Sequence, residues 1–287
     1  MANANVKAVS MKSDGNGYYF EITVQGQDAS IIPYYTYKST EGLYHTIRVK
    51  IVVLGEGDLI LAHGIDLSSR IFDSKQTEKW GTLGVLVKPL GDVNTKKKFL
   101  LTCCHNVISP LTNLPYSGRT SQTVTVSTLD GKINTPIGTI REAIRDREAD
   151  AALIEVDEAV AAKIAKYIPK IGTPQKPQLL NDENKDKTTA YMYGAKTGPD
   201  KNARTSGKIT SLYSTIKVTY SSNEEFEIIN TIAISNDGKS ISQPGDSGSC
   251  VVDGNYNVLG IVVAGSSEVT YILPIHTLLS KFKVQLA

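Results

Sequence analysis

The sequence has 287 residues, which is enough for one large domain or two modest ones. Hydrophobic residues make up 40% of it and charged residues 21%, a balance typical of a globular protein with a sizeable core. The net charge is +2, with acidic and basic residues mixed along the chain, so no basic patch predicts a nucleic-acid partner. No apolar window approaches the length of a membrane-spanning helix, and we expect no membrane partner.

The N-terminal residues and the cysteines predict where the protein works. The first twenty residues contain no apolar stretch suited to a signal peptide. Cys103, Cys104 and Cys250 are odd in number and two are adjacent, so they define no disulfide framework. A chain without disulfides is typical of a reducing compartment, and we expect a cytoplasmic location. The adjacent cysteines lack a second ligand pair at suitable spacing, so we expect no metal site and no cofactor.

Short strand-like segments, rich in Val, Ile, Thr and Tyr, follow one another along the chain and are separated by turn residues. They cover residues 18–24, 45–54, 82–90, 97–104, 123–129, 150–156, 214–220, 226–234, 249–253, 257–265 and 269–275. Two segments, 158–168 and 275–284, have the pattern of a helix. The pattern predicts an all-β sandwich or barrel. Because residues 1–79 contain none of the motifs below, we predict an N-terminal accessory region there and a second domain over residues 80–287.

Three short motifs in the second domain carry side chains suited to catalysis. An apolar strand ends in small residues before His105, which places an imidazole at the rim of a core, although a lone histidine is usually structural. Asp150 directly precedes a buried strand and could hold an imidazole tautomer, although many strands begin with Asp. Ser247 lies in a Gly-Asp-Ser-Gly turn. Its glycines allow the backbone N–H groups of Gly245 and Ser247 to form an oxyanion hole, and the alternative is a plain glycine-rich hairpin.

The order of these motifs favours one kind of catalytic triad. The histidine, aspartate and serine follow one another at separations of 45 and 97 residues. This order is that of the chymotrypsin arrangement, and it differs from the orders of subtilisin and the α/β-hydrolases. From about Gly81 to the C-terminus, the sequence resembles the trypsin-like (chymotrypsin-fold) serine peptidases. The resemblance rests on TCCHN, DAALI, GDSGS and GIVVAG, and GTLGVLV and YILPI are similar to disulfide-free prokaryotic members.

The resemblance implies two six-stranded antiparallel β-barrels with the triad in the cleft between them. To these the sequence adds the β-rich accessory region and a short C-terminal helix. In this arrangement Ser247 is the nucleophile, His105 the general base and Asp150 the residue that orients it.

The resemblance also implies where the substrate binds. Val263, Ala264 and Gly265 form the edge to which a substrate is added as a strand. Ile241 stands at the base of the specificity pocket, where trypsin has an aspartate, so we expect no preference for Lys or Arg.

Activation departs from the family pattern. Secreted zymogens free an N-terminal Ile-Val-Gly-Gly whose amine pairs with the aspartate before the nucleophile. Asp246 occupies that position, but the tetrapeptide is absent. Asp246 therefore finds a cation or backbone amides within the fold, or waits for another factor to order the loop.

The sequence thus predicts an intracellular serine endopeptidase that cleaves a protein or peptide substrate through an acyl-enzyme. We expect the residues before Trp80 to couple it to a regulatory protein partner, and the alternative is that they extend the first barrel. A second function is a catalytically inactive protease-like module that binds extended peptides. A viral capsid or structural β-protein has only the fold in its favour.

Overall fold

The computed structural model describes residues 6–14, 17–25, 34–38, 44–54, 65–75, 78–91, 96–108, 116–118, 120, 123–127, 134–156, 158–162, 164–219 and 225–287. Up to residue 54 the description covers the backbone only. The chain divides into two compact units, Met1–His63 and Gly64–Ala287. Residues 55–64, 128–129 and 220, which belong to the predicted accessory region or to predicted strands, lie outside the described residues.

The first unit contains one four-stranded sheet in the order β1-β2-β4-β3. Its strands are β1 (Val6–Asp14), β2 (Gly17–Gln25), β3 (Tyr34–Lys38) and β4 (Tyr44–Leu54). Two antiparallel pairs, β1 with β2 and β3 with β4, join through the parallel pair β2 and β4. All strand pairs described for this sheet are therefore internal to the first unit.

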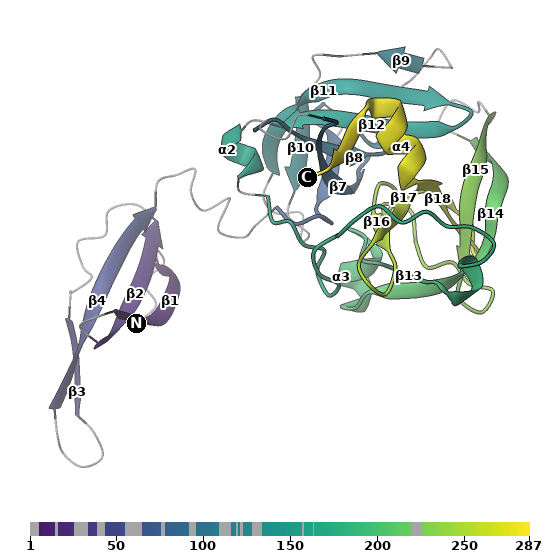
Figure 1. The fold of residues 1–287 in the computed structure, drawn as a ribbon. Helices are drawn as coiled ribbons and strands as arrows, with labels where there is room; N and C mark the ends of the chain where they lie inside the picture. The colour runs from purple at the N-terminus through teal and green to yellow at the C-terminus, as the bar shows by residue number, and fades with distance from the viewer. Residues whose placement is uncertain are drawn as a thin grey trace. The chain divides into compact units, whose positions relative to one another are not determined.

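The second unit opens with a curled nine-stranded sheet (Figure 1). Its strands are β5 (Arg70–Asp73), β6 (Gly81–Thr82), β7 (Val85–Pro89), β8 (Lys98–Thr102), β9 (Tyr116–Gly118), β10 (Thr123–Ser127), β11 (Asn134–Asp146), β12 (Ala149–Val156) and β19 (Val284–Leu286). The predicted count of six is wrong for this sheet, because short pieces such as β6, β9 and β19 add to it. Strand β5 pairs with β10 and β6, so it belongs to this sheet, and the two compact units of the chain meet between His63 and Gly64.

The remaining strands form a closed six-stranded antiparallel barrel in the order β13-β14-β15-β18-β17-β16. They are β13 (Thr189–Met192), β14 (Thr205–Thr219), β15 (Glu225–Ser235), β16 (Cys250–Val252), β17 (Val258–Gly265) and β18 (Thr270–Pro274). This barrel has the predicted strand number. The two β structures together confirm the expected chymotrypsin-like fold.

Helices are few and short in the described part of the chain. They are η1 (Cys104–Asn106), α2 (Glu158–Ala161), η2 (Lys185–Lys187), α3 (Thr197–Lys201) and α4 (Ile275–Phe282). The predicted C-terminal helix is confirmed as α4, but the predicted helix over 158–168 stops after one turn. The rest of that segment pairs with the start of the unit, because the backbone N–H groups of Ala165 and Leu67 donate to Ile65 and Tyr167. None of the helices in the described residues is long and apolar enough to cross a membrane.

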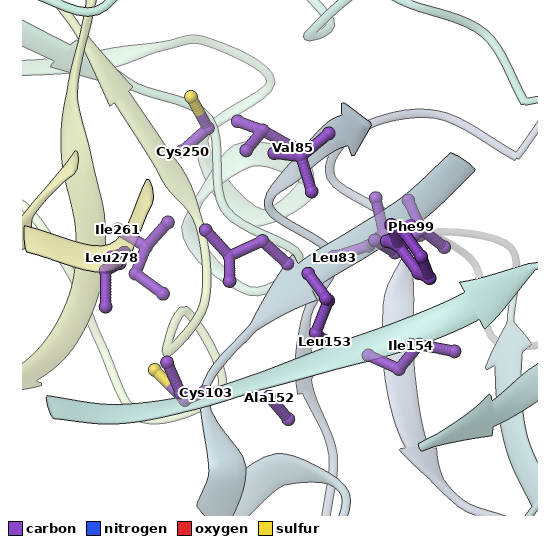
Figure 2. Close-up of a cluster of buried hydrophobic side chains, with 14 of the residues drawn as sticks. Leu83, Val85, Phe99, Cys103, Ala152, Leu153, Ile154, Cys250, Ile261 and Leu278 are labelled. Carbon is purple, nitrogen blue, oxygen red and sulfur yellow. The ribbon is translucent and has the colours of Figure 1, made fainter. Parts of the chain in front are cut away.

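One hydrophobic core connects the two β structures. Figure 2 shows part of it, in which Leu83, Phe99 and Leu153 belong to the same buried cluster as Cys250 and Ile261 of the barrel. Helix α4 adds buried side chains to the same core, and β19 then pairs with β7. The C-terminal segment therefore returns from the barrel to the nine-stranded sheet and fixes the two against each other.

Candidate active site

His105 lies where the nine-stranded sheet meets the barrel. Strand β8 ends at Thr102, and the chain turns into η1, whose middle residue is His105. The imidazole Nδ1 lies 2.8 Å from Oδ2 of Asp150, and the backbone N–H of His105 donates to Oδ1 at 3.1 Å. The His105 side chain is 23% exposed while the Asp150 side chain is fully buried. The carboxylate thus fixes both the ring and its backbone, and the other ring nitrogen can act on a substrate.

Asp150 owes its position to the β11–β12 hairpin. In this hairpin Arg145 and Asp150 are direct cross-strand partners. The Arg145 side chain is 4% exposed, and its Nε lies 3.7 Å from Oδ2 of Asp150. The sequence analysis missed Arg145, although Asp146 and the residues after it have the composition of a tight turn that would place it opposite Asp150.

The Ser247 loop is tied by its backbone to the residues around His105. Asn106, the residue after His105, donates from Nδ2 to the carbonyl oxygen of Ser247 at 2.8 Å. The backbone N–H of Thr82 donates to the same oxygen at 2.7 Å. A Cβ at Gly248 would lie 2.2 Å from the carbonyl oxygen of Thr82, and its φ is +92°, so only glycine fits there. Sequence reasoning missed Asn106, whose adjacency to His105 was the available signal.

The predicted oxyanion donors lie on a loop that is held from both sides. Gly245 has a φ of +102°, and an added Cβ would lie 2.7 Å from the Trp80 ring. Its carbonyl oxygen accepts a 2.9 Å hydrogen bond from Oγ1 of Thr82. Among the described residues, no acceptor takes a hydrogen bond from the backbone N–H of Gly245 or of Ser247. Both groups are thus available to a developing oxyanion.

Asp246 finds its partners inside the fold. Its carboxylate is fully buried. Oδ1 accepts the backbone N–H groups of Lys196 and Thr197 at 2.9 and 3.0 Å, and Oδ2 accepts that of Gln243 at 2.8 Å. Burial raises the pKa of the Asp246 carboxyl, and the three N–H donors oppose that rise. Of the alternatives left open by the sequence, backbone amides hold this carboxylate and so order the loop.

The predicted substrate-binding strand ends beside the Ser247 loop. Val262 exchanges backbone hydrogen bonds with Gly248 and Ser249 at 2.7 and 2.9 Å. Beyond Val262, the register shifts at Val263, and Ala264 and Gly265 pair with β18 on one side. No strand of the described residues pairs with these three residues on the other side. Val263 is buried, Ala264 is half-buried and Gly265 is exposed. This geometry leaves an open backbone edge next to the candidate nucleophile.

Ile241, the predicted base of the specificity pocket, is a buried residue. Its side chain is 2% exposed and belongs to the core of the six-stranded barrel. The position near Gly265 is taken by hydroxyl groups instead, because an added Cβ there would lie 3.2 Å from Oγ of Ser242. Oγ1 of Thr270 lies 2.8 Å from the Oγ atoms of Ser240 and Ser242. Sequence reasoning did not find these hydroxyls, since no motif surrounds them.

The cysteines are free and buried. Burial raises the pKa of each thiol, and the Asp150 carboxylate raises those of Cys103 and Cys104 further. Such thiols are neutral and unreactive at ordinary pH. Among the described residues, no group of three His, Cys, Asp or Glu side chains is arranged to hold a metal ion.

Comparison with known proteins agrees with this geometry. The sequence model described as Trypsin matches residues 95–278, more than half of the chain. The fold is similar to that of Nocardiopsis protease, with a TM-score of 0.52, 14% identity and coverage of 77% of this chain and 98% of that one. Thermobifida fusca protease A gives 0.49, with 16% identity and coverage of 77% and 98%. No curated protein sequence matches this chain. The chain belongs to the trypsin family of serine endopeptidases.

Proposed function

We propose that the protein cleaves peptide bonds with Ser247 as nucleophile, His105 as general base and Asp150 as the residue that orients the imidazole. The 2.8 Å hydrogen bond between Nδ1 of His105 and Asp150 is the observation that carries this proposal. It fixes the tautomer in which Nε2 can accept a proton. The hydrogen bond from Asn106 to Ser247 keeps the nucleophile's backbone next to the residue that follows His105.

In the proposed reaction, Oγ of Ser247 forms a bond to the scissile carbonyl carbon while its proton passes to Nε2 of His105. The backbone N–H groups of Gly245 and Ser247 bind the oxyanion. The imidazolium then gives its proton to the leaving amine as the C–N bond breaks, which leaves an acyl-enzyme. Water hydrolyses that ester by the same steps, with His105 again acting as base.

The substrate is a protein or peptide bound in extended form. The open edge at residues 263–265 offers backbone groups for a strand-like substrate, next to the Ser247 loop. Ser240, Ser242 and Thr270 supply hydroxyl groups near Gly265. No carboxylate is among these three side chains, which agrees with the expectation that Lys and Arg are not the preferred residues at the cleaved bond.

We propose a reducing, cytoplasmic setting and a regulatory role for residues 1–63. The three free buried cysteines support the first, because they leave the fold independent of disulfides. The second is supported by a sheet whose described pairings all lie within its own unit. A separate unit of this kind can bind a regulatory protein partner without rearranging the barrels.

Labelling with a fluorophosphonate probe tests the catalytic proposal. Wild-type protein should be labelled and should hydrolyse a peptide library, whereas Ser247→Ala should lose both. Loss of one triad member in model enzymes lowers the rate by a factor on the order of 10⁴ to 10⁶.

Two matched controls accompany this test. Ser249→Ala removes a buried hydroxyl that has no hydrogen-bond partner among the described residues, so it should stay active. His276→Ala changes an exposed imidazole on α4 and should have far less effect than His105→Ala. A wild type that binds extended peptides without labelling would favour the inactive module instead.

A further inference from the structure

A buried arginine lies beside the aspartate of the proposed triad. Arg145 and Asp150 are opposite each other in the β11–β12 hairpin, and their side chains are 4% and 0% exposed. Nε of Arg145 lies 3.7 Å from Oδ2 of Asp150, the same oxygen that binds Nδ1 of His105 at 2.8 Å. The carboxylate therefore lies between an imidazole and a guanidinium.

We propose that Arg145 is a positioning residue that keeps Asp150 ionised and thereby sets the pH at which the Asp150–His105 pair releases its proton. This inference rests on the proposed triad. Arg145 does not touch the substrate in this role and acts through Asp150.

The physical reason is the cost of a buried negative charge. Taking a carboxylate out of water favours its protonated form, and a cation within a few ångströms reverses that preference. A guanidinium is suited to this place because it keeps its charge at every working pH. Water does not screen the attraction between Arg145 and Asp150, since both side chains are buried. Arg145 thus gives His105 a permanently ionised partner.

The same charge also affects the imidazolium that forms during the reaction. Asp150 and His105 are hydrogen-bonded, so they titrate as a coupled pair and not as two separate groups. A fixed positive charge beside the pair weakens its hold on a proton, whichever of the two residues carries it.

Other titratable groups lie near this pair on the neighbouring segments. The thiols of Cys103 and Cys104 have raised pKa values and stay neutral. At the hairpin tip, Asp146 and Glu148 share Lys281, at 3.0 and 2.9 Å. On the other edge of β11, Tyr116 of β9 is the cross-strand partner of Arg145. None of these adds a second fixed cation beside Oδ2.

The test is the pH profile of kcat/KM for the full-length protein, with Arg145→Met and Arg145→Lys compared with wild type. Arg145→Met removes the charge and keeps an unbranched apolar stem in its place. Its acid limb should move to higher pH by about one unit or more, the effect expected of a charge at this distance. Arg145→Lys keeps a charge and should restore most of the wild-type profile.

Arg147→Met is the matched control. Arg147 lies in the same hairpin, but it is exposed and pairs with Glu227 at the surface, so its loss should leave the profile in place. The proposal is overturned if Arg145→Met lowers kcat/KM by the same factor at every pH, or if Arg147→Met shifts the profile equally. If Arg145→Met does not fold, Arg145→Gln carries the same test with the same expected shift.

A measurement without turnover separates this inference from the proposed function. The proton in the hydrogen bond between Nδ1 of His105 and Asp150 can be followed as the pH changes by its resonance in the downfield region of the proton NMR spectrum. It should titrate at higher pH in Arg145→Met than in wild type, and an unchanged titration overturns the proposal. A wild type that is not labelled by fluorophosphonate defeats the proposed function, yet this titration still reports whether Arg145 controls the pair.

Discussion

The side-chain amide of Asn106 donates a 2.8 Å hydrogen bond to the backbone carbonyl oxygen of Ser247. The same amide lies 3.0 Å from Oγ1 of Thr102, which donates to the carbonyl oxygen of Thr82 at 2.8 Å. The backbone N–H of Thr82 returns to Ser247. This closed set of contacts joins the segment that carries His105 to the loop that carries Ser247, so the two are held in a fixed relation.

Asn106→Ala should weaken both catalysis and stability. The carbonyl oxygen of Ser247 and Oγ1 of Thr102 then lose a buried hydrogen-bond donor, which lowers the free energy of unfolding by about 1–3 kcal/mol. We expect kcat to fall about tenfold, as a loosened Ser247 loop would cause, measured together with chemical denaturation. Asn184→Ala is the control, because it removes a similar bond to Leu179 in an exposed loop. An Asn106→Ala enzyme as fast as wild type would show that the contact does not position the nucleophile.

The pH dependence of stability should carry the signature of Asp246. Burial raises its folded-state pKa above the ordinary value of 3.8, so the folded protein binds this proton more tightly than the unfolded chain. The contribution of Asp246 to stability is therefore full below 3.8 and is lost as the pH rises through the raised pKa. Asp246→Asn does not titrate, so the unfolding free energy of wild type minus that of the variant should decrease with rising pH. A difference that increases over this window would contradict the assignment.

Gly194→Ala should disable the oxyanion loop without removing a charged group. An added Cβ would lie 2.0 Å from Oδ1 of Asp246, so the carboxylate must leave the N–H groups of Lys196 and Thr197. Because the loss of an oxyanion donor costs about 10²- to 10³-fold in kcat, we expect a fall of that order in fluorophosphonate labelling rate. Gly254→Ala is the control, since an added Cβ there would lie 4.0 Å from its nearest neighbour, Cε2 of Tyr191. Equal labelling of the two variants would rule this mechanism out.

Reducing agent should leave stability and activity unchanged. Cys103, Cys104 and Cys250 are free and buried, so no covalent link is available for dithiothreitol to break. Melting curves and peptide hydrolysis with and without the reagent should superimpose. A marked fall in melting temperature would show that a disulfide forms in solution, and the cytoplasmic proposal would then fail.

Removal of residues 1–63 should leave a folded protease with altered control. The strands of the second unit pair with one another, starting with β5 after the division at Gly64. We therefore expect a cooperative unfolding transition to remain, while the rate of peptide hydrolysis changes several-fold relative to the full chain. The regulatory proposal is lost if the shortened chain cleaves peptides at the full-length rate and responds to candidate partners as the full chain does.

Much of the fold could be predicted because strand composition and turn residues are local signals. The catalytic motifs were also local, and the structure places His105 and Asp150 in contact as the sequence led us to expect. Residues 158–168 show the limit of such signals. Their helical pattern is overridden by backbone pairing with Ile65, about a hundred residues earlier in the chain.

The rest of the site depends on contacts between distant segments. Two of the three donors to Asp246 come from Lys196 and Thr197, some 50 residues away, and a sequence does not show which backbone N–H groups will meet a side chain. Ile241 was placed by counting back from Ser247. Its side chain, however, is buried in the core of the six-stranded barrel, and hydroxyl groups lie near Gly265 instead.

The pairing of β19 with β7 shapes how the protease must fold. Val284–Leu286 and Val85–Pro89 stand at opposite ends of the second unit in sequence, yet they share one ladder. Such distant pairing forms slowly, because the intervening chain must be ordered first. The nine-stranded sheet therefore gains its edge strand β19 only after the barrel and α4 are in place. This topology couples the folding of the nine-stranded sheet to that of the barrel.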